Sequence, residues 1–67
     1  MSTLVVNGER RELADGSTLA DIVGSLTAEQ RGVAVALDGE VVPRSDWPTT
    51  PLADGQQVEV LRAVQGG

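Results

Sequence analysis

Residues 33–42 read VAVALDGEVV, and this stretch decides the fold of the chain. Larger apolar residues alternate with smaller ones up to Leu37, a period of two that predicts a β-strand with its bulkier side turned inward. The dipeptide Asp38-Gly39 then separates this run from two further valines, and such a dipeptide tolerates the positive φ angles of a tight turn. The stretch therefore predicts a β-hairpin.

An amphipathic helix is expected upstream of this hairpin. Four apolar residues occupy the i, i+3, i+4 and i+7 positions of one helical face, namely Leu19, Ile22, Val23 and Leu26. Thr18 can cap the first backbone amides, and Asp21 follows three positions later, near the positive end of the helix dipole. Thr27 and Gly32 mark the region where the helix has ended.

The N-terminal residues predict a second hairpin. Leu4 and Val6 alternate with their neighbours, Asn7-Gly8 interrupts the run, and the short polar segment 9–13 follows. The turn signal Ala14-Asp15-Gly16 then leads into the helix.

The C-terminal half contains an irregular crossing and a last strand. Residues 44–52 hold Pro48 and Pro51 and follow Pro43, so we expect a connecting segment without regular structure beyond a single short turn. Asp54-Gly55 predicts another turn, after which a final strand begins near Val58 and runs toward Val64.

This order of elements predicts an α+β architecture in which one mixed sheet wraps around one helix, because a single apolar stripe needs a single sheet to cover it. We expect the final strand in the middle of the sheet. Trp47, the only aromatic residue, is expected to cover a corner of the core rather than to anchor a partner. The expected core is otherwise aliphatic and comprises Leu4, Val6, Leu13, Leu19, Ile22, Val23, Leu26, Val35, Leu37, Val41, Leu52, Val58 and Val60.

Composition narrows the function. A chain of 67 residues makes one small domain, and it contains no His, Cys, Tyr or Lys. It therefore has no thiol nucleophile, imidazole base, Schiff-base lysine or Cys/His zinc site, which nearly excludes an enzyme that works alone, and no cofactor is expected.

Charge and hydropathy argue against two classes of partner. The net charge of −5 leaves no basic stripe for nucleic acid. No apolar run approaches the roughly 20 residues that a membrane span needs, and the first residues lack the layout of a signal peptide. We therefore expect a cytoplasmic protein with neither nucleic acid nor membrane as a partner.

The last residues, Val64-Gln65-Gly66-Gly67, are the feature that suggests chemistry. Residues 1–63 are expected to form the domain and residues 64–67 a flexible tail. Glycines without a Cβ make a narrow thread, and four extended residues reach about 13 Å, enough to enter a cleft on another protein. The group delivered is the Gly67 carboxylate, which a partner enzyme with ATP would have to activate. Terminal glycines without any chemical role are the alternative.

The strand order and the tail together resemble the ubiquitin-like β-grasp fold, and more closely the ThiS family of sulfur carriers of thiamine thiazole biosynthesis. The likeness covers essentially the whole chain. It is carried by the segment 32–44 with its Val-Pro-Arg end, by Trp47, by the Asp-Gly turn inside segment 52–60, and by the terminal Gly-Gly. Gln56 departs from the family, which often has an acidic residue there.

The resemblance implies a reaction cycle that other proteins perform on Gly67. A ThiF-type adenylating enzyme would use Mg-ATP to form an acyl-adenylate, a sulfur donor would displace AMP to leave a thiocarboxylate, and a ThiG-type thiazole synthase would accept the sulfur. Gly66 would have to stay narrow to thread the entry channel. Val64 and Arg62 would contact the partners at the channel mouth.

Three alternatives remain open on the sequence. One is the small subunit of molybdopterin synthase, which is typically longer than this chain. Another is a ubiquitin-like modifier that forms isopeptide bonds through Gly67, although a chain without Lys cannot build side-chain-linked polymers. The third is a plain binding module.

Overall fold

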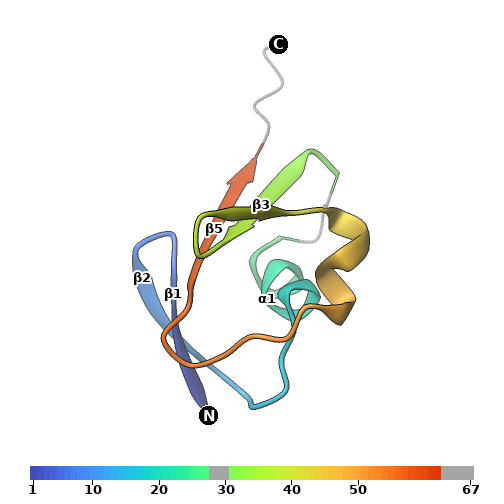
Figure 1. The fold of residues 1–67 in the computed structure, drawn as a ribbon. Coiled ribbons are helices and arrows are strands. Elements are labelled where there is room, and N and C mark those ends of the chain that lie inside the picture. Colours follow the sequence, from blue (N-terminus) through green and yellow to red (C-terminus); the bar gives the residue numbers. More distant parts are fainter. Residues whose placement is uncertain (28–30, 63–67) are drawn as a thin grey trace.

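The computed structural model describes residues 1–27 and 31–62. Within these residues, five strands form one sheet in the order β2-β1-β5-β3-β4, and α1 lies against one face of it (Figure 1). This confirms the predicted α+β class with a single wrapped sheet. The elements are β1 (Ser2–Val6), β2 (Glu9–Leu13), α1 (Leu19–Leu26), β3 (Val33–Leu37), β4 (Glu40–Val42), the 3₁₀ helix η1 (Arg44–Thr49) and β5 (Gln57–Arg62).

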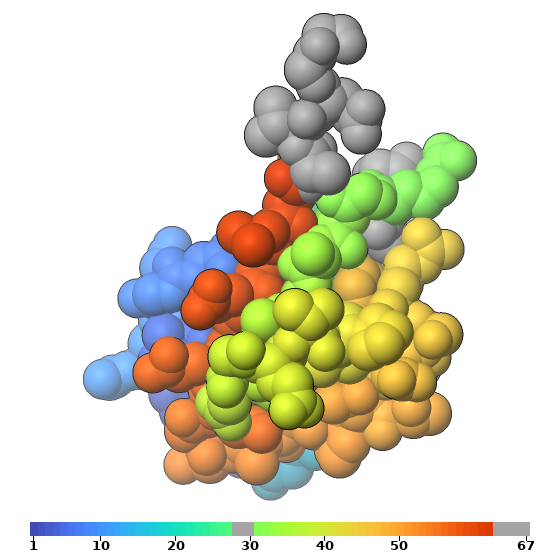
Figure 2. Space-filling view, turned by 45° about the horizontal axis from the view of Figure 1, so that its top comes forward, coloured from blue at the N-terminus to red at the C-terminus, as the bar shows by residue number. Residues whose placement is uncertain are grey.

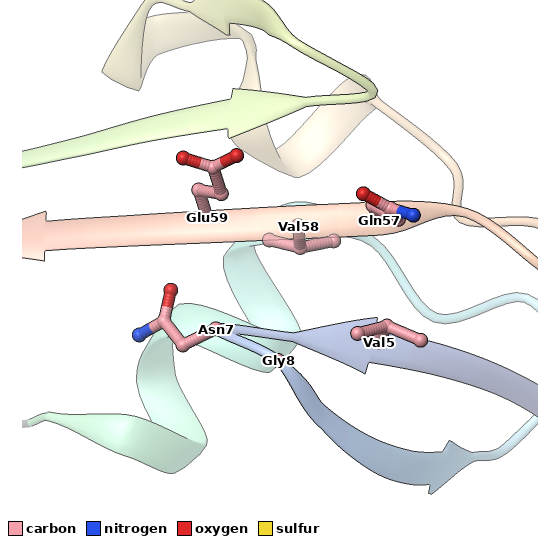
Figure 3. Close-up of a pocket in the computed structure, with 6 residues that line it drawn as sticks. All are labelled: Val5, Asn7, Gly8, Gln57, Val58 and Glu59. Atoms are coloured by element: carbon pink, nitrogen blue, oxygen red, sulfur yellow. The ribbon is translucent and has the colours of Figure 1, made fainter.

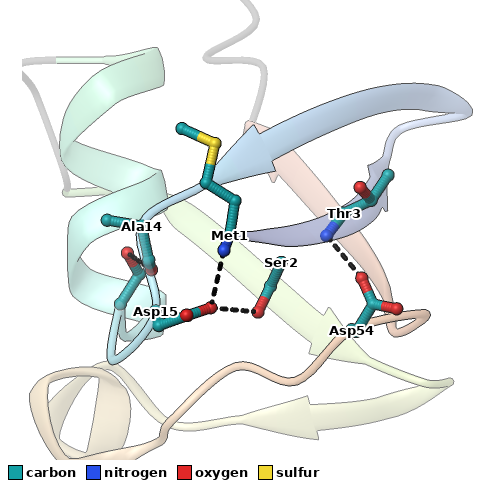
Figure 4. Close-up of polar contacts among 7 residues, drawn as sticks. Met1, Ser2, Thr3, Ala14, Asp15 and Asp54 are labelled. Carbon is teal, nitrogen blue, oxygen red and sulfur yellow. Dashed lines mark hydrogen bonds and ion pairs between the residues drawn. The ribbon is translucent and has the colours of Figure 1, made fainter.

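The final strand β5 lies at the centre of the sheet, as predicted. It runs parallel to β1 and antiparallel to β3. The crossing segment before it is fixed to β1, because the backbone N–H of Thr3 donates to Asp54 Oδ1 at 2.6 Å (Figure 4). The N–H of Gly55 also donates to the Thr3 carbonyl at 2.8 Å. The turn before β5 is thereby held beside Thr3, and β5 then begins next to Val5.

Both hairpins turn through the predicted dipeptides. Asn7 and Gly8 have φ values of 51° and 81°, and Asp38 and Gly39 have φ values of 50° and 85°. Positive φ at both central residues matches the right-handed twist of the flanking strands, which is why Asn-Gly and Asp-Gly are favoured there. These two turns join β1 to β2 and β3 to β4, the two strand pairs that flank β5.

The helix begins at a capping box, as predicted. Thr18 Oγ1 accepts from the backbone N–H of Asp21 at 3.4 Å, and Asp21 Oδ2 accepts from the backbone N–H of Thr18 at 2.9 Å. Each side chain satisfies a backbone donor that the first helical turn leaves unpaired. At the other end Thr27 is the C-cap, and its N–H donates to the Val23 carbonyl at 3.0 Å.

The core lies between α1 and the inner sheet face. Trp47 is 2% exposed and donates from Nε1 to the Val42 carbonyl at 2.9 Å, so the predicted covering role is confirmed. Several expected core residues are only partly buried and pack around the edge of the core, namely Leu13, Leu26, Leu37 and Val60. The buried set is Leu4, Val6, Leu19, Ile22, Val23, Val35, Trp47, Leu52 and Val58.

The placement of Val41 in the core is wrong. A two-residue turn pairs Leu37 with Glu40, Ala36 with Val41 and Val35 with Val42. Since paired residues share a sheet face, Val42 joins buried Val35 on the inner face. Val41 lies on the outer face and is 72% exposed.

The crossing segment is more regular than predicted. The expected single short turn is a six-residue 3₁₀ helix, η1, with Pro48 inside it. Proline is tolerated because its fixed φ suits a 3₁₀ helix and a short helix loses only one hydrogen bond to it. The N–H of Asp46 donates to the Pro43 carbonyl at 2.9 Å, and buried Trp47 holds the segment beside α1.

No helix among residues 1–27 and 31–62 is long and apolar enough to cross a membrane.

Candidate functional site

Three of the residues predicted to form the site, Val64, Gly66 and Gly67, lie outside the described residues. The fourth, Arg62, is the last residue of β5. What the structure describes is therefore the strand end, residues 60–62, from which the predicted tail departs. The strand end lies at the pole of the molecule opposite the N-terminus (Figure 1).

The strand end is paired along one side by β3. Val60 faces Val35, Leu61 faces Ala34 and Arg62 faces Val33. On the other side the ladder with β1 is shorter, because its last pair is Val6 with Val58. In the described part of the chain, the backbone of the strand end therefore has a neighbouring strand on one side only.

Arg62 ties the strand end to the helix. Its guanidinium donates from a terminal nitrogen to Thr27 Oγ1 at 2.7 Å. Thr27 caps the C-terminus of α1, where the helix dipole is negative and a cation is favoured. Arg62 thus has an intramolecular contact that sequence reasoning, which assigned it to partners, did not anticipate.

A hollow of about 300 Å³ opens between the end of α1 and the strand end. Its apolar lining is partly buried, and Asn7, Thr27 and Arg62 supply the polar groups. The described residues that line it are Asn7, Leu26, Thr27, Val33, Val60 and Arg62.

A second, open hollow of about 460 Å³ lies along β1 and β5 (Figure 3). Among the described residues, Glu59 is the only titratable side chain that lines it, and the others are Val5, Asn7, Gly8, Gln57 and Val58. General acid–base catalysis needs an ionisable side chain within hydrogen-bond reach of the group that reacts, usually beside a second functional side chain. The described residues of this hollow offer no such pair of side chains. The described residues also contain no cluster of carboxylates that could hold a metal ion.

The outer sheet face beside the strand end carries an apolar strip. Leu61 is 61% exposed and Val41 is 72% exposed, and between them lie Ala34 and Ala36, their partners on β3. In the space-filling view β5 and β3 lie side by side, and both are exposed at the surface (Figure 2). Sequence reasoning missed this outer apolar strip because it placed Val41 inside, although counting back from the two-residue turn would have put Val41 outside.

The ThiS family model matches residues 4–67, nearly the whole chain. The chain belongs to the ThiS family. The ThiS assignment places it among the sulfur carriers of thiamine biosynthesis and confirms the resemblance seen in the sequence.

Individual ThiS relatives agree with the family match. The sulfur carrier protein ThiS of Thermus thermophilus is 42% identical over 92% of this chain and 95% of its own length. The crystal structure of ThiS from Geobacter metallireducens superposes with a TM-score of 0.81 at 32% identity, covering 97% of this chain and 99% of that one.

A further relative is larger than a ThiS protein. A thiazole synthase of Paramagnetospirillum magneticum is 34% identical over 96% of this chain, but this chain spans only 20% of that protein's length. A ThiS-like segment therefore occurs within a protein named thiazole synthase.

Proposed function

We propose that this chain carries sulfur as a thiocarboxylate on Gly67, which a ThiF-type enzyme forms with Mg-ATP and a ThiG-type thiazole synthase consumes. The observation that carries the proposal is the extent of the family match, which runs through residue 67 and so includes Gly66 and Gly67. The tail 64–67 is the carrier segment and residues 1–63 are the handle that partners recognise.

The chemistry divides between the chain and its partners. One oxygen of the Gly67 carboxylate attacks the α-phosphorus of ATP, pyrophosphate leaves, and an acyl-adenylate forms. A sulfide-level donor then attacks the acyl carbon and AMP leaves with the bridging oxygen, so the product is a thiocarboxylate. In residues 1–27 and 31–62 neither hollow offers the groups for these steps, and this chain supplies the carboxylate and its delivery.

The narrow end of the tail is the second part of the proposal. A residue without a Cβ lets a backbone approach a partner more closely than any other residue does. Gly66 therefore allows Gly67 to reach a reaction centre through a channel that a side chain would block. Val64 and Arg62 contact the partner at the mouth of that channel.

The outer apolar strip is the surface on which the partners dock. It begins at Leu61, one residue before the end of β5, and crosses β3 to Val41. Exposed apolar groups that lie together, rather than singly, mark interaction surfaces. Docking there would hold the domain while the tail enters the partner.

Thiazole synthase is the acceptor that the comparisons favour. The larger relative named thiazole synthase includes a segment that is 34% identical to this chain. A carrier on the same polypeptide as its acceptor has a raised effective concentration, which is useful only if the two react. This supports thiazole synthase over molybdopterin synthase as the partner.

The test is the intact mass of the chain after incubation with ATP, magnesium, a ThiF-type enzyme and sulfide. The expected result is a mass increase equal to the replacement of one oxygen by sulfur, confined to the C-terminal peptide and absent without ATP. A variant that lacks Gly67 is the matched control. No increase, with an enzyme proven on another carrier, would reject the proposal.

A second arm separates the alternatives. The thiocarboxylate form is mixed with thiazole synthase or with the large subunit of molybdopterin synthase, and loss of sulfur is followed by mass. Loss only with the second enzyme would assign the chain to molybdopterin synthesis. Attachment to lysines of a target protein, in place of sulfur transfer, would identify a modifier.

A further inference from the structure

The side chain of Asn7 binds the backbone of β5 in both directions. Its Oδ1 accepts from the Val60 N–H at 2.8 Å, and its Nδ2 donates to the Val60 carbonyl at 3.2 Å. The close-up shows this amide just beyond the end of β1 with its oxygen turned toward β5 (Figure 3). A primary amide has the donor and acceptor geometry of a peptide group.

These two hydrogen bonds continue the ladder between β1 and β5 beyond the point where the backbone of β1 turns away. The N–H of Val5 donates to the Gln56 carbonyl at 3.0 Å, and the N–H of Asn7 donates to the Val58 carbonyl at 2.9 Å. Alternate residues of a strand direct their N–H and C=O groups to the same side, so Val60 is the next residue to face β1. The chain has turned away at Asn7-Gly8, and the Asn7 side chain supplies the missing peptide group.

We propose that Asn7 is a positioning residue for the reaction at Gly67, an inference that rests on the proposed function. Clamping Val60 gives the strand end a partner on both sides, β3 on one and the Asn7 amide on the other. The direction in which the chain leaves the sheet is thereby fixed two residues after Val60, at Arg62.

Fixing this direction lowers the entropy that is lost when the tail is placed in the partner enzyme. A strand end bound on one side only samples more backbone states, and each residue that must be ordered on binding loses conformational entropy. Preorganisation at the root of the tail removes part of this cost from the step in which Gly67 is placed at the reaction centre.

The second hairpin provides a matched control. Asp38 occupies the same position of the other turn, with φ of 50° against 51° for Asn7. Its Oδ1 accepts from the Gln57 N–H at 2.9 Å, so it also binds β5 from a turn, but at the first residue of the strand. Asp38→Gly removes this bond, together with the one that Gln56 Nε2 donates to Asp38 Oδ2 at 3.5 Å, at the end of β5 far from the tail.

The experiment compares Asn7→Gly, Asn7→Asp and Asp38→Gly with the unaltered chain. Glycine accepts the positive φ and removes both bonds, whereas aspartate keeps the acceptor for the Val60 N–H and loses the donor. Two readouts are used, amide hydrogen exchange at Val60 by NMR and steady-state turnover by a ThiF-type enzyme with ATP and sulfide.

The size of each expected effect depends on how many of the two hydrogen bonds to Val60 the variant keeps. Exchange at Val60 rises about tenfold in Asn7→Gly, less in Asn7→Asp and not in Asp38→Gly, since a lost hydrogen bond is worth about tenfold in local opening. At saturating carrier, kcat falls about three- to tenfold in Asn7→Gly and less in Asn7→Asp. If a substitution only lowered the folded fraction of the chain, a higher carrier concentration would restore the original kcat.

Three outcomes would overturn the inference. Unchanged exchange at Val60 in Asn7→Gly would show that the clamp does not exist. Lost protection with a kcat equal to that of Asp38→Gly would show a clamp without a positioning role. An unaltered chain that is never adenylated would reject the proposed function, and the positioning role with it, while the exchange data would still report on the clamp.

Discussion

The guanidinium of Arg62 lies 2.7 Å from Thr27 Oγ1, so the last described residue of β5 is bound to the C-cap of α1. This hydrogen bond joins two residues that are 35 positions apart in the sequence, and it ties the end of β5 to the end of α1. This contact gives Arg62 a second candidate role beside the partner contact proposed for it, and the two roles make different predictions.

Thr27→Val and Arg62→Gln separate these roles. Both variants remove the charge-assisted hydrogen bond, and each should lower the free energy of unfolding by about 0.5–1 kcal/mol because the bond is exposed. If Arg62 contacts a partner, only Arg62→Gln also lowers kcat/KM with the adenylating enzyme. Chemical denaturation and steady-state kinetics measure the two quantities, and equal kcat/KM values for both variants would remove Arg62 from the interface.

Gly66→Ala is expected to impair adenylation strongly while the fold is retained. The added methyl group crowds the proposed entry channel, and the substituted position lies outside residues 1–62. Gln65→Ala is the control, because it shortens a side chain in the same tail without widening Gly66. Pyrophosphate release measures adenylation, and an unchanged rate in Gly66→Ala would disprove the narrow channel.

Leu61→Asp should weaken docking on the outer apolar strip. An exposed apolar residue contributes little to stability, so the free energy of unfolding should change by less than about 0.5 kcal/mol. Burying a carboxylate against an apolar partner surface is costly, and kcat/KM should fall at least about tenfold. Ala53→Asp is the matched control, because Ala53 is exposed and lies in the crossing segment before β5, off the strip. Similar kcat/KM values for both variants would show that partners dock elsewhere.

Ile22→Ala should destabilise the domain by about 2–5 kcal/mol, since Ile22 is fully buried and its truncation leaves a cavity. Ile22→Val should cost about 0.5–1.5 kcal/mol. Thermal and denaturant unfolding measure both. A wild-type melting temperature in Ile22→Ala would mean that this face of α1 does not pack on the sheet.

The features that the sequence predicted well are local ones. Asn7-Gly8, Asp38-Gly39 and the Thr18–Asp21 capping box each depend on residues within three positions of one another, so their geometry follows from local chemistry. Val41 was misplaced because the face of a strand depends on register, and the register had not been counted from the turn.

The contacts at the root of the tail were beyond sequence reasoning for a different reason. Asn7 and Val60 are 53 positions apart, and their pairing depends on β5 lying beside β1. Nothing in the dipeptide Asn-Gly distinguishes a side chain that binds a distant strand from one that only permits a turn. The regularity of η1 was missed because Trp47 stabilises it through burial, which outweighs the prolines.

The parallel pairing of β1 and β5 also determines how the domain bears a load. The N-terminus and the end of β5 lie at opposite poles, and the two strands are joined between Val5 and Gln57 and between Val6 and Val58 (Figure 1). Tension applied between the two ends pulls these strands along their axes in opposite directions, so their hydrogen bonds are sheared together rather than opened one by one. An enzyme that pulls on the tail while the N-terminus is held must break these hydrogen bonds together. The force that it needs is therefore greatest at the start of unfolding.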